Sequence, residues 1–299
     1  MDLDLLKGVI VPIITVIDED ENLDEQGMRD QVDYVIEGGV DGILAFGSNG
    51  EFYQADEDFM EETLQVIIDQ TRGRVPVYFG IGAINTKKGV RLAKMAESHG
   101  VAGVSILQPM FITPTEDELY HHFATIANAI PETPVLLYNN PGRTGYKMTL
   151  NLVDKLAHGV KNIVGMKDTS GDITFTEECI RRTRDINFRV FGGKDTLLYA
   201  SLCVGAVGGV CTAGNFMPGL IGAVYKEFVA GNLEASLEAQ FKLNPVRLAM
   251  DLTTFPVAAK DMCLLQGREV GKPFLPTRLT ADEKTLDIFR KVMKEADLL

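Results

Sequence analysis

The stretch NIVGMKDTSGD, residues 162–172, ends an apolar run on Lys167 and continues at once with polar residues. A lysine amine at the end of a buried strand is poorly solvated, which disfavours its ammonium form and leaves more free amine. Free amine is the form that attacks a ketone to make a Schiff base. A lysine in this position can equally extend to solvent at the edge of a sheet, so its surroundings must decide between chemistry and structure.

Two further side chains with suitable chemistry occur in YNNPGRTG, residues 138–145. The Tyr138 phenol ends an apolar run and could carry the proton transfers that accompany imine formation and hydrolysis. Arg143 offers a forked cation that matches a carboxylate. Their structural alternatives are a core tyrosine bonded to a backbone carbonyl and an ion pair at the surface.

The turn GSNGE, residues 47–51, is the third candidate. Its glycines allow a tight turn and close approach to a ligand, so the amides of Ser48 and Asn49 could cradle a carboxylate. The Ser48 hydroxyl could also accept and relay a proton. Gly-Ser-Asn-Gly is also an ordinary turn sequence, so this motif gains meaning only beside the other two.

Each candidate follows a short apolar run that we predict to be a strand. Most of these runs are continuously apolar, as expected for parallel strands buried on both faces. The predicted strands are 9–16, 42–47, 75–82, 103–108, 134–139, 162–167, 188–193 and 206–212. Segments with helical spacing separate them, including 24–39, 86–100, 115–130 and 149–159. Thr115 and Glu118 form a capping box at the start of one predicted helix.

Eight strands that alternate with helices predict an α/β fold, a (β/α)8 TIM barrel, with an open doubly wound sheet as the lesser alternative. We expect the catalytic barrel to occupy residues 1–218. A C-terminal helical extension would occupy 219–299, because 219–250 and 282–299 hold more helix than one barrel unit needs. The loops after the strands build the active site in such barrels, which would bring the three candidates together.

Composition excludes several kinds of partner. The 299 residues carry a net charge of −13 with a pI near 4.8, which argues against nucleic acid or an anionic membrane. The start of the chain lacks the basic region of a secretory signal and any run long enough to span a bilayer, so we expect a cytoplasmic protein. The scattered cysteines are interpreted as free thiols. The histidines form no H-E-x-x-H pattern, and we expect no metal and no organic cofactor.

GSNGE, YNNPGRTG and VGMKDTSGD resemble, in order and spacing, the motifs of the dihydrodipicolinate synthase/N-acetylneuraminate lyase family of pyruvate-handling class I aldolases. The resemblance covers essentially the whole chain. It implies that Lys167 forms a Schiff base with pyruvate or a related keto acid and that Tyr138 shuttles protons at the imine. It also implies a homotetramer of barrels with C-terminal helices.

The resemblance implies substrate-binding roles as well. Ser48 and Asn49 correspond to the residues of the G-x-x-G-E turn that bind the keto-acid carboxylate. Val210 resembles the residue of strand eight whose backbone carbonyl faces the imine, and Gly193 fits the family's substrate-proximal loop. Arg143 matches the arginine with which dihydrodipicolinate synthases bind the carboxylate of their second substrate.

Other residues point to a different subgroup of the family. Synthases usually have two threonines in place of Ser48 and Asn49. They also have a tyrosine in place of Phe111, which has no hydroxyl for the proton relay. GSNGEF and NIVGMKD look like 4-hydroxy-2-oxoglutarate and 2-keto-3-deoxy sugar-acid aldolases. Lys88, at a position of the lysine feedback site of regulated synthases, would repel a cationic inhibitor.

We therefore expect a carbon–carbon lyase that cleaves or forms a 4-hydroxy-2-oxo acid or a 2-keto-3-deoxy sugar acid, with pyruvate and an aldehyde as the other side of the reaction. The alternative within the same chemistry, favoured by Arg143, is dihydrodipicolinate (4-hydroxy-tetrahydrodipicolinate) synthesis from pyruvate and aspartate semialdehyde. Two other interpretations remain open. Phe111 suggests a non-catalytic keto-acid sensor, and FGGKD at 191–195 suggests a phosphate-binding barrel.

Overall fold

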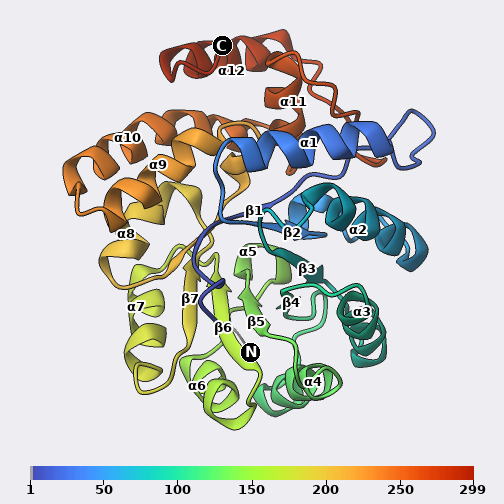
Figure 1. Cartoon of the computed structure of the whole chain (residues 1–299), viewed down its shortest axis with the longest axis vertical. Coiled ribbons are helices and arrows are strands. Elements are labelled where there is room, and N and C mark those ends of the chain that lie inside the picture. Colours follow the sequence, from blue (N-terminus) through green and yellow to red (C-terminus); the bar gives the residue numbers. More distant parts are fainter. Residues whose placement is uncertain (1–2) are drawn as a thin grey trace.

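The computed structural model describes residues 3–299 and shows a closed barrel of parallel strands (Figure 1). The strands follow chain order around the barrel, and β8 closes it by pairing with β1. Their bounds are β1 Gly8–Pro12, β2 Gly42–Ala45, β3 Val77–Ile81, β4 Gly103–Leu107, β5 Val135–Asn139, β6 Ile163–Asp168, β7 Arg189–Gly192 and β8 Gly208–Val210. The predicted (β/α)8 barrel is confirmed.

Every strand except β6 is shorter than the apolar run that predicted it. The first run was expected to be a strand over 9–16, whereas β1 ends at Pro12. The chain stays buried beyond that point, but the Ile14 N–H donates to the Asn215 side chain at 2.9 Å instead of to a neighbouring strand. An apolar run predicts burial well and the end of a strand poorly, because a buried backbone group can be satisfied by a side chain.

Helices surround the barrel, and further helices follow it (Figure 1). The helices of the barrel region are α1 Glu25–Glu37, α2 Glu57–Thr71, α3 Thr86–Ser98, α4 Glu116–Asn128, α5 Pro141–Thr144, α6 Leu150–Gly159, α7 Ile173–Arg182 and α8 Leu198–Cys203. Short 3-10 turns are η1 Ser48–Gly50, η2 Asp195–Leu197, η3 Thr212–Asn215 and η4 Met250–Leu252. The predicted capping box of Thr115 and Glu118 is present at the start of α4.

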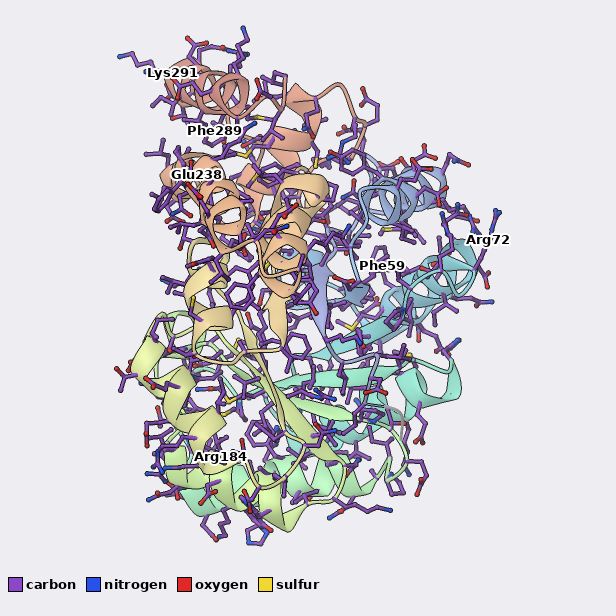
Figure 2. The ribbon with its side chains drawn as sticks, turned by 60° about the vertical axis from the view of Figure 1, so that its left-hand side comes forward. Phe59, Arg72, Arg184, Glu238, Phe289 and Lys291 are labelled. Carbon is purple, nitrogen blue, oxygen red and sulfur yellow. The ribbon has the colours of Figure 1, made fainter. Side chains whose placement is uncertain are left out.

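The C-terminal part of the chain is helical, as expected. It contains α9 Pro218–Val229, α10 Leu233–Ala249, α11 Val257–Leu265 and α12 Glu283–Glu295. The stretch 219–250, expected to be helical, is two helices, because Gly231 takes a left-handed conformation with φ of 83° between them. Figure 2 shows Phe289 and Lys291 of α12 on different sides of that helix. Phe289 is buried in the core and Lys291 is exposed.

Two apolar clusters form the core. The larger one lies between the strands and the surrounding helices. The smaller one comes from every strand except β4, together with Leu6 just before β1, and consists of Leu6, Ile10, Leu44, Tyr78, Leu136, Val164, Phe191 and Val210. Leu136 and Tyr138 are two residues apart on β5 and therefore share a face. The smaller cluster thus fills the barrel interior and leaves Tyr138 one layer nearer the carboxyl ends of the strands.

Other sequence-based expectations concern cysteines and membranes. Cys179, Cys203, Cys211 and Cys263 are free thiols, which confirms that prediction. Within residues 3–299, no helix combines the length and the apolar character needed to cross a membrane.

Candidate active site

Strand pairing brings the two principal catalytic candidates together. In the parallel pairing of β5 with β6, Tyr138 lies opposite Lys167. The Lys167 Nζ is 4.3 Å from the centroid of the Tyr138 ring, and each residue is 5% exposed. The amine and the phenol therefore share one nearly dry site at the carboxyl ends of the strands, as the sequence predicted.

The surroundings of the Tyr138 phenol favour its ionised form. Burial raises the pKa of the phenol, but the positive charge of Lys167 and the side chains of Ser48, Asn140 and Thr169 outweigh burial, so the pKa is lowered overall. Asn140 Nδ2 donates to the phenol oxygen at 2.8 Å. A phenol with a lowered pKa exchanges protons more readily near neutral pH than an ordinary tyrosine does.

The strand ends that carry Lys167 and Tyr138 are fixed by a buried carboxylate. Asp168 Oδ1 accepts from Asn139 Nδ2 at 2.8 Å, which ties β6 to β5. Its Oδ2 accepts from Ser170 Oγ at 2.9 Å and Thr176 Oγ1 at 2.8 Å. With its lone pairs occupied, Asp168 costs little to bury and holds the loop after β6 in place.

The turn predicted to bind a carboxylate lies beside this pair. Ser48 and Asn49 begin η1, where backbone N–H groups have no partner within the turn. The Asn49 Nδ2 donates to Thr212 Oγ1 at 2.9 Å, which links the turn to the chain after β8.

Three buried oxygens near the amine have no hydrogen-bond partner in the described chain: Ser48 Oγ, Asn49 Oδ1 and Thr169 Oγ1. Ser48 and Thr169 lie close enough to the Tyr138 phenol to lower its pKa, yet neither makes a hydrogen bond of good geometry with it. Buried polar atoms in native proteins are normally satisfied. All three residues face the same cavity, so a polar ligand there would supply the missing partners.

The cavity has a volume of about 380 Å³ and collects residues from several strand ends. It is lined by Ser48, Asn49, Tyr138, Asn140, Gly142, Arg143, Lys167, Thr169, Ser170, Gly193, Lys194, Asp195, Thr212, Arg247 and Phe255. Lys167, Arg143, Lys194 and Arg247 are cations, whereas Asp195 is the one carboxylate in this set. A cationic cavity in a chain of net charge −13 suits an anionic substrate.

Arg143 lies at the mouth of this cavity on the short helix α5, which the sequence did not predict. Its guanidinium stacks on the Phe255 ring at 4.7 Å from the centroid. Within residues 3–299 no carboxylate forms an ion pair with it. An exposed, uncompensated guanidinium at the rim can therefore meet an acidic group of an incoming molecule.

Gly193 also lines the cavity, and its lack of a side chain matters. A Cβ atom there would lie 2.2 Å from Thr169 Oγ1 and 2.8 Å from the Asp168 carbonyl oxygen. The loop after β7 can approach the loop after β6 only with glycine at this position.

Val210 is placed differently from the other candidates. Its side chain packs in the interior cluster of the barrel and is not part of the cavity wall. Because the expected contribution of Val210 is its backbone carbonyl, that role remains a prediction.

Several cavity residues were missed by the sequence analysis. Asn140 follows directly on β5 and Thr212 comes two residues after the end of β8, so the rule that residues at strand ends build barrel sites could have found them. Asp195 was not missed, because it ends the FGGKD segment that the sequence analysis singled out. Its carboxylate accepts the N–H groups of Thr212 and Ala213 at 3.1 and 2.9 Å. Arg247 lies on α10, far along the chain, and no local pattern marks it.

The Phe111 ring stands away from this cavity. It is 89% exposed, has a φ of 81° and does not contribute to the cavity wall. Within its own chain, this position supplies nothing to the site.

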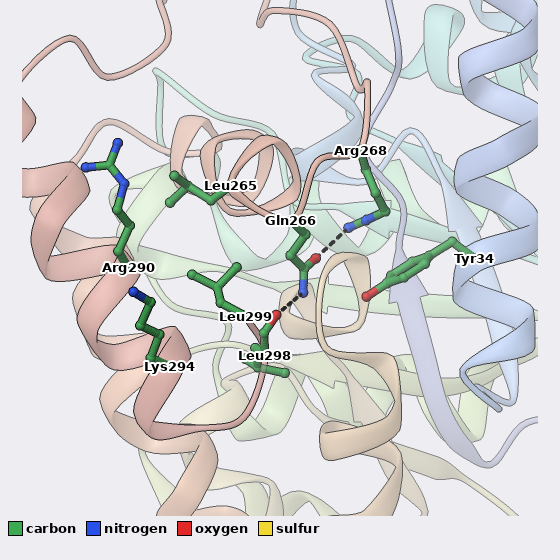
Figure 3. Close-up of a pocket in the computed structure, with 8 residues that line it drawn as sticks. All are labelled: Tyr34, Leu265, Gln266, Arg268, Arg290, Lys294, Leu298 and Leu299. Atoms are coloured by element: carbon green, nitrogen blue, oxygen red, sulfur yellow. Dashed lines mark hydrogen bonds between the residues drawn. The ribbon is translucent and has the colours of Figure 1, made fainter.

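A larger cavity of about 520 Å³ lies elsewhere, between α1, α11 and α12 (Figure 3). It is lined by Tyr34, Leu265, Gln266, Arg268, Arg290, Lys294, Leu298 and Leu299. Gln266 crosses it with bonds to Arg268 and to the Leu298 carbonyl, at 3.2 and 3.3 Å. None of the catalytic candidates reaches this cavity, so size alone does not locate the chemistry.

A closed (β/α)8 barrel with a buried lysine and tyrosine on adjacent strand ends defines an enzyme of the class I aldolase type, a carbon–carbon lyase. The profile of the Dihydrodipicolinate synthetase family matches residues 5–296. The chain therefore belongs to that family.

Individual relatives agree with this assignment. The chain is 34% identical to the 4-hydroxy-tetrahydrodipicolinate synthase of Trichlorobacter lovleyi, over 99% of this chain and 100% of the relative. The crystal structure of the dihydrodipicolinate synthase of Thermotoga maritima superposes with a TM-score of 0.94 at 32% identity, over 98% of this chain and 99% of the other. A structure described as a monomeric dihydrodipicolinate synthase variant gives 0.95 at 30% identity, over the full length of both chains.

Proposed function

We propose that this protein forms a Schiff base between Lys167 and pyruvate and condenses the resulting enamine with aspartate semialdehyde, as a 4-hydroxy-tetrahydrodipicolinate synthase. The observation that carries the proposal is the buried Lys167 amine beside Tyr138, with unpartnered oxygens around it. The names of the relatives favour the synthase over the cleavage of sugar acids, which the sequence alone favoured.

The residues suggest how the first half of the reaction runs. The amine of Lys167 attacks the keto carbon of pyruvate, and loss of water from the carbinolamine gives the imine. Tyr138 accepts and returns the protons of these steps. Ser48 and Asn49 hold the pyruvate carboxylate, so that the keto carbon stays near the amine.

The second half forms the carbon–carbon bond. Tyr138 takes a proton from the methyl carbon of the imine. The enamine carbon then attacks the aldehyde carbon, and Tyr138 returns the proton to the aldehyde oxygen, which becomes a hydroxyl. Arg143 binds the carboxylate of the aldehyde at the mouth of the cavity. Because the product is a ring that contains the nitrogen of the second substrate, that amine must then replace Lys167 on the former keto carbon, which frees the enzyme.

Borohydride reduction in the presence of pyruvate tests the covalent step. We expect a stable adduct that peptide mapping locates on Lys167. An unlabelled Lys167, or a label on another lysine, would contradict the proposal.

An aldolase that acts on 4-hydroxy-2-oxo acids is the second candidate. It is favoured by Ser48–Asn49 in the carboxylate turn and by Phe111, which has no hydroxyl. Side-by-side assays on aspartate semialdehyde with pyruvate, and on hydroxy-oxo acids with coupled pyruvate detection, separate the two. Turnover confined to the hydroxy-oxo acids would replace the synthase with the aldolase.

Two further expectations belong to this proposal. We propose a homotetramer, because members of the family commonly assemble in this way, and we also propose a cytoplasmic location. Light scattering of the purified protein and fractionation of the producing cells test them.

A further inference from the structure

A buried ion pair joins the carboxylate turn to the C-terminal extension. Lys260 Nζ on α11 lies 3.5 Å from Glu51 Oε2, and both side chains are 0% exposed. Glu51 directly follows Ser48, Asn49 and Gly50 in the turn GSNGE. The two partners are 209 positions apart in the chain.

The same contact includes the backbone of the segment that follows α11. Glu51 Oε1 accepts from the Phe274 N–H at 3.1 Å, and Lys260 Nζ donates to the Lys272 carbonyl oxygen. The Phe274 ring packs edge-on against Phe59 of α2, with centroids 5.6 Å apart. The turn is thus held at one end, from outside the barrel, by Lys260 and residues 272–274.

The backbone conformation of the turn requires such support. Glu51 is a non-glycine residue in the left-handed region, with φ of 55°, which is an uncommon conformation that its surroundings must maintain. Elsewhere the turn is held by Thr15 Oγ1, which donates to the Gly50 carbonyl at 2.8 Å, and by the bond from Asn49 to Thr212. The Ser48 carbonyl accepts from the Glu51 N–H at 3.3 Å, whereas its hydroxyl has no hydrogen-bond partner among the described residues.

Stability alone does not account for the pair. Two charges taken fully out of water cost more than their attraction usually returns, and an apolar pair of similar volume is often as stable or more stable. Burial lowers the pKa of Lys260 to about 8, and it raises the pKa of Glu51 despite the opposing charge of Lys260. Because the buried pair does not favour folding, we look for its role in the function of the turn.

We propose that the Glu51–Lys260 pair is a positioning element that holds the Ser48–Asn49 turn in register with Lys167, so that the C-terminal extension takes part in binding the keto-acid carboxylate. The inference rests on the proposed function, because it assigns the turn to the pyruvate carboxylate. Neither residue touches the substrate. Both act through the turn.

The test compares three variants with a matched control. Lys260→Met removes the cation, Glu51→Gln keeps an acceptor for the Phe274 N–H, and the double variant removes both charges. Asp261→Asn is the control, because Asp261 is a buried acid on the same helix that anchors Thr280 and does not contact the turn. The main readout is the pyruvate concentration that gives half-maximal borohydride trapping of Lys167, measured beside kcat, KM and melting temperature.

We expect each single variant to raise the pyruvate concentration for half-maximal trapping by about 10- to 100-fold, since a misplacement of about 1 Å can cost that much. The reaction at saturating pyruvate should change far less. The double variant should bind pyruvate as weakly as the single variants, because the two residues act as a unit. It should nevertheless be more stable than Lys260→Met, because no charge is left buried alone.

Two results would overturn the inference. Variants that melt earlier but trap pyruvate like the parent would make the pair purely structural. If Asp261→Asn raised the pyruvate concentration for half-maximal trapping equally, the effect would belong to the C-terminal extension in general and not to the Glu51–Lys260 pair. If Lys260→Met does not fold, Glu51→Gln and the double variant still decide the question. If the parent protein itself traps no pyruvate, the proposed function has failed, which is a different outcome.

Discussion

The Lys167–Tyr138 pair and the GSNGE turn at residues 47–51 are held in place in different ways. Tyr138 and Lys167 are placed by the pairing of β5 with β6, and a satisfied carboxylate next to Lys167 fixes both strand ends. Ser48 and Asn49 stand on a turn outside the sheet, held by side chains from distant parts of the chain. The position of Lys167, proposed to form the covalent bond, thus depends on secondary structure, whereas the positions of Ser48 and Asn49, proposed to bind the substrate, depend on tertiary contacts.

This difference predicts two kinds of mutational effect. Substitutions at the strand ends should lower kcat or prevent formation of the covalent adduct, while pyruvate still fits the cavity. Changes at the supports of the turn should weaken pyruvate binding while the chemistry persists.

The largest effect is expected for Lys167→Arg. Arginine keeps the positive charge but does not deprotonate in proteins, so it cannot form the imine. We expect no borohydride-trapped adduct and no turnover above the uncatalysed reaction. Lys161→Arg is the control, because Lys161 is exposed just before β6 and should leave the activity unchanged. Normal turnover by Lys167→Arg would remove the covalent mechanism.

Tyr138→Phe should come next. Loss of a general acid–base group typically lowers the rate about 100- to 10,000-fold. We expect kcat to fall by such a factor and the trapping of pyruvate to slow, whereas the fold persists.

Tyr78→Phe is the matched control for Tyr138→Phe. Tyr78 is also a buried barrel tyrosine, but its hydroxyl donates to the Leu5 carbonyl at 3.0 Å in the interior cluster. Its loss should cost about 1 kcal/mol of stability and leave kcat unchanged. Equal losses of kcat in both variants would show that Tyr138 only supports the fold.

A smaller effect is expected for Thr212→Val. Valine has the shape of threonine but leaves Asn49 Nδ2 without its acceptor. An unsatisfied buried group costs about 1 to 3 kcal/mol, so we expect the KM for pyruvate to rise on the order of tenfold with little change in kcat. A loss of kcat without a change in KM would show that the turn acts in the chemical step and not in pyruvate binding, which would contradict the proposed difference between the two regions.

The smallest effect is a dependence on pH. Burial lowers the pKa of Lys260 to about 8, although the carboxylate of Glu51 opposes this shift. The Cys263 thiol also lies near Lys260, but burial raises its pKa to about 11, so it is neutral near pH 8. Burial raises the pKa of Glu51, and the charge of Glu21 also raises it. Above about pH 8 the folded protein loses the ammonium, so the KM for pyruvate should rise. This rise should be absent in Lys260→Met.

The free energy of unfolding, in contrast, should increase with pH. Between about pH 8 and the ordinary lysine value of 10.5, the unfolded chain binds the proton that the folded protein has lost. The contribution of Lys260 to the free energy of unfolding therefore increases with pH in this window. Chemical denaturation of the parent and of Lys260→Met at pH 7.5 and 9.5 measures it, and a decrease relative to the variant would contradict this assignment.

The sequence by itself determined the barrel and the proximity of the two proposed catalytic residues. Continuous apolar runs predict buried parallel strands, and polar residues at their ends must meet at one end of a barrel. Lys167 and Tyr138 occupy such ends on consecutive strands, so their proximity follows from local patterns and chain order. The sequence also singled out the GSNGE turn and Arg143 as cavity residues, because they lie within a few residues of strand ends, and their roles are proposals.

Only the tertiary structure decided what holds and completes the site. Arg247 reaches the cavity from α10, and Lys260 reaches Glu51 from α11. Neither has a local signal, because a lysine or arginine on an amphipathic helix normally faces water. A buried ion pair between distant residues arises from the packing of the extension on the barrel. It depends on the positions of both partners in space, and no spacing in the sequence encodes them.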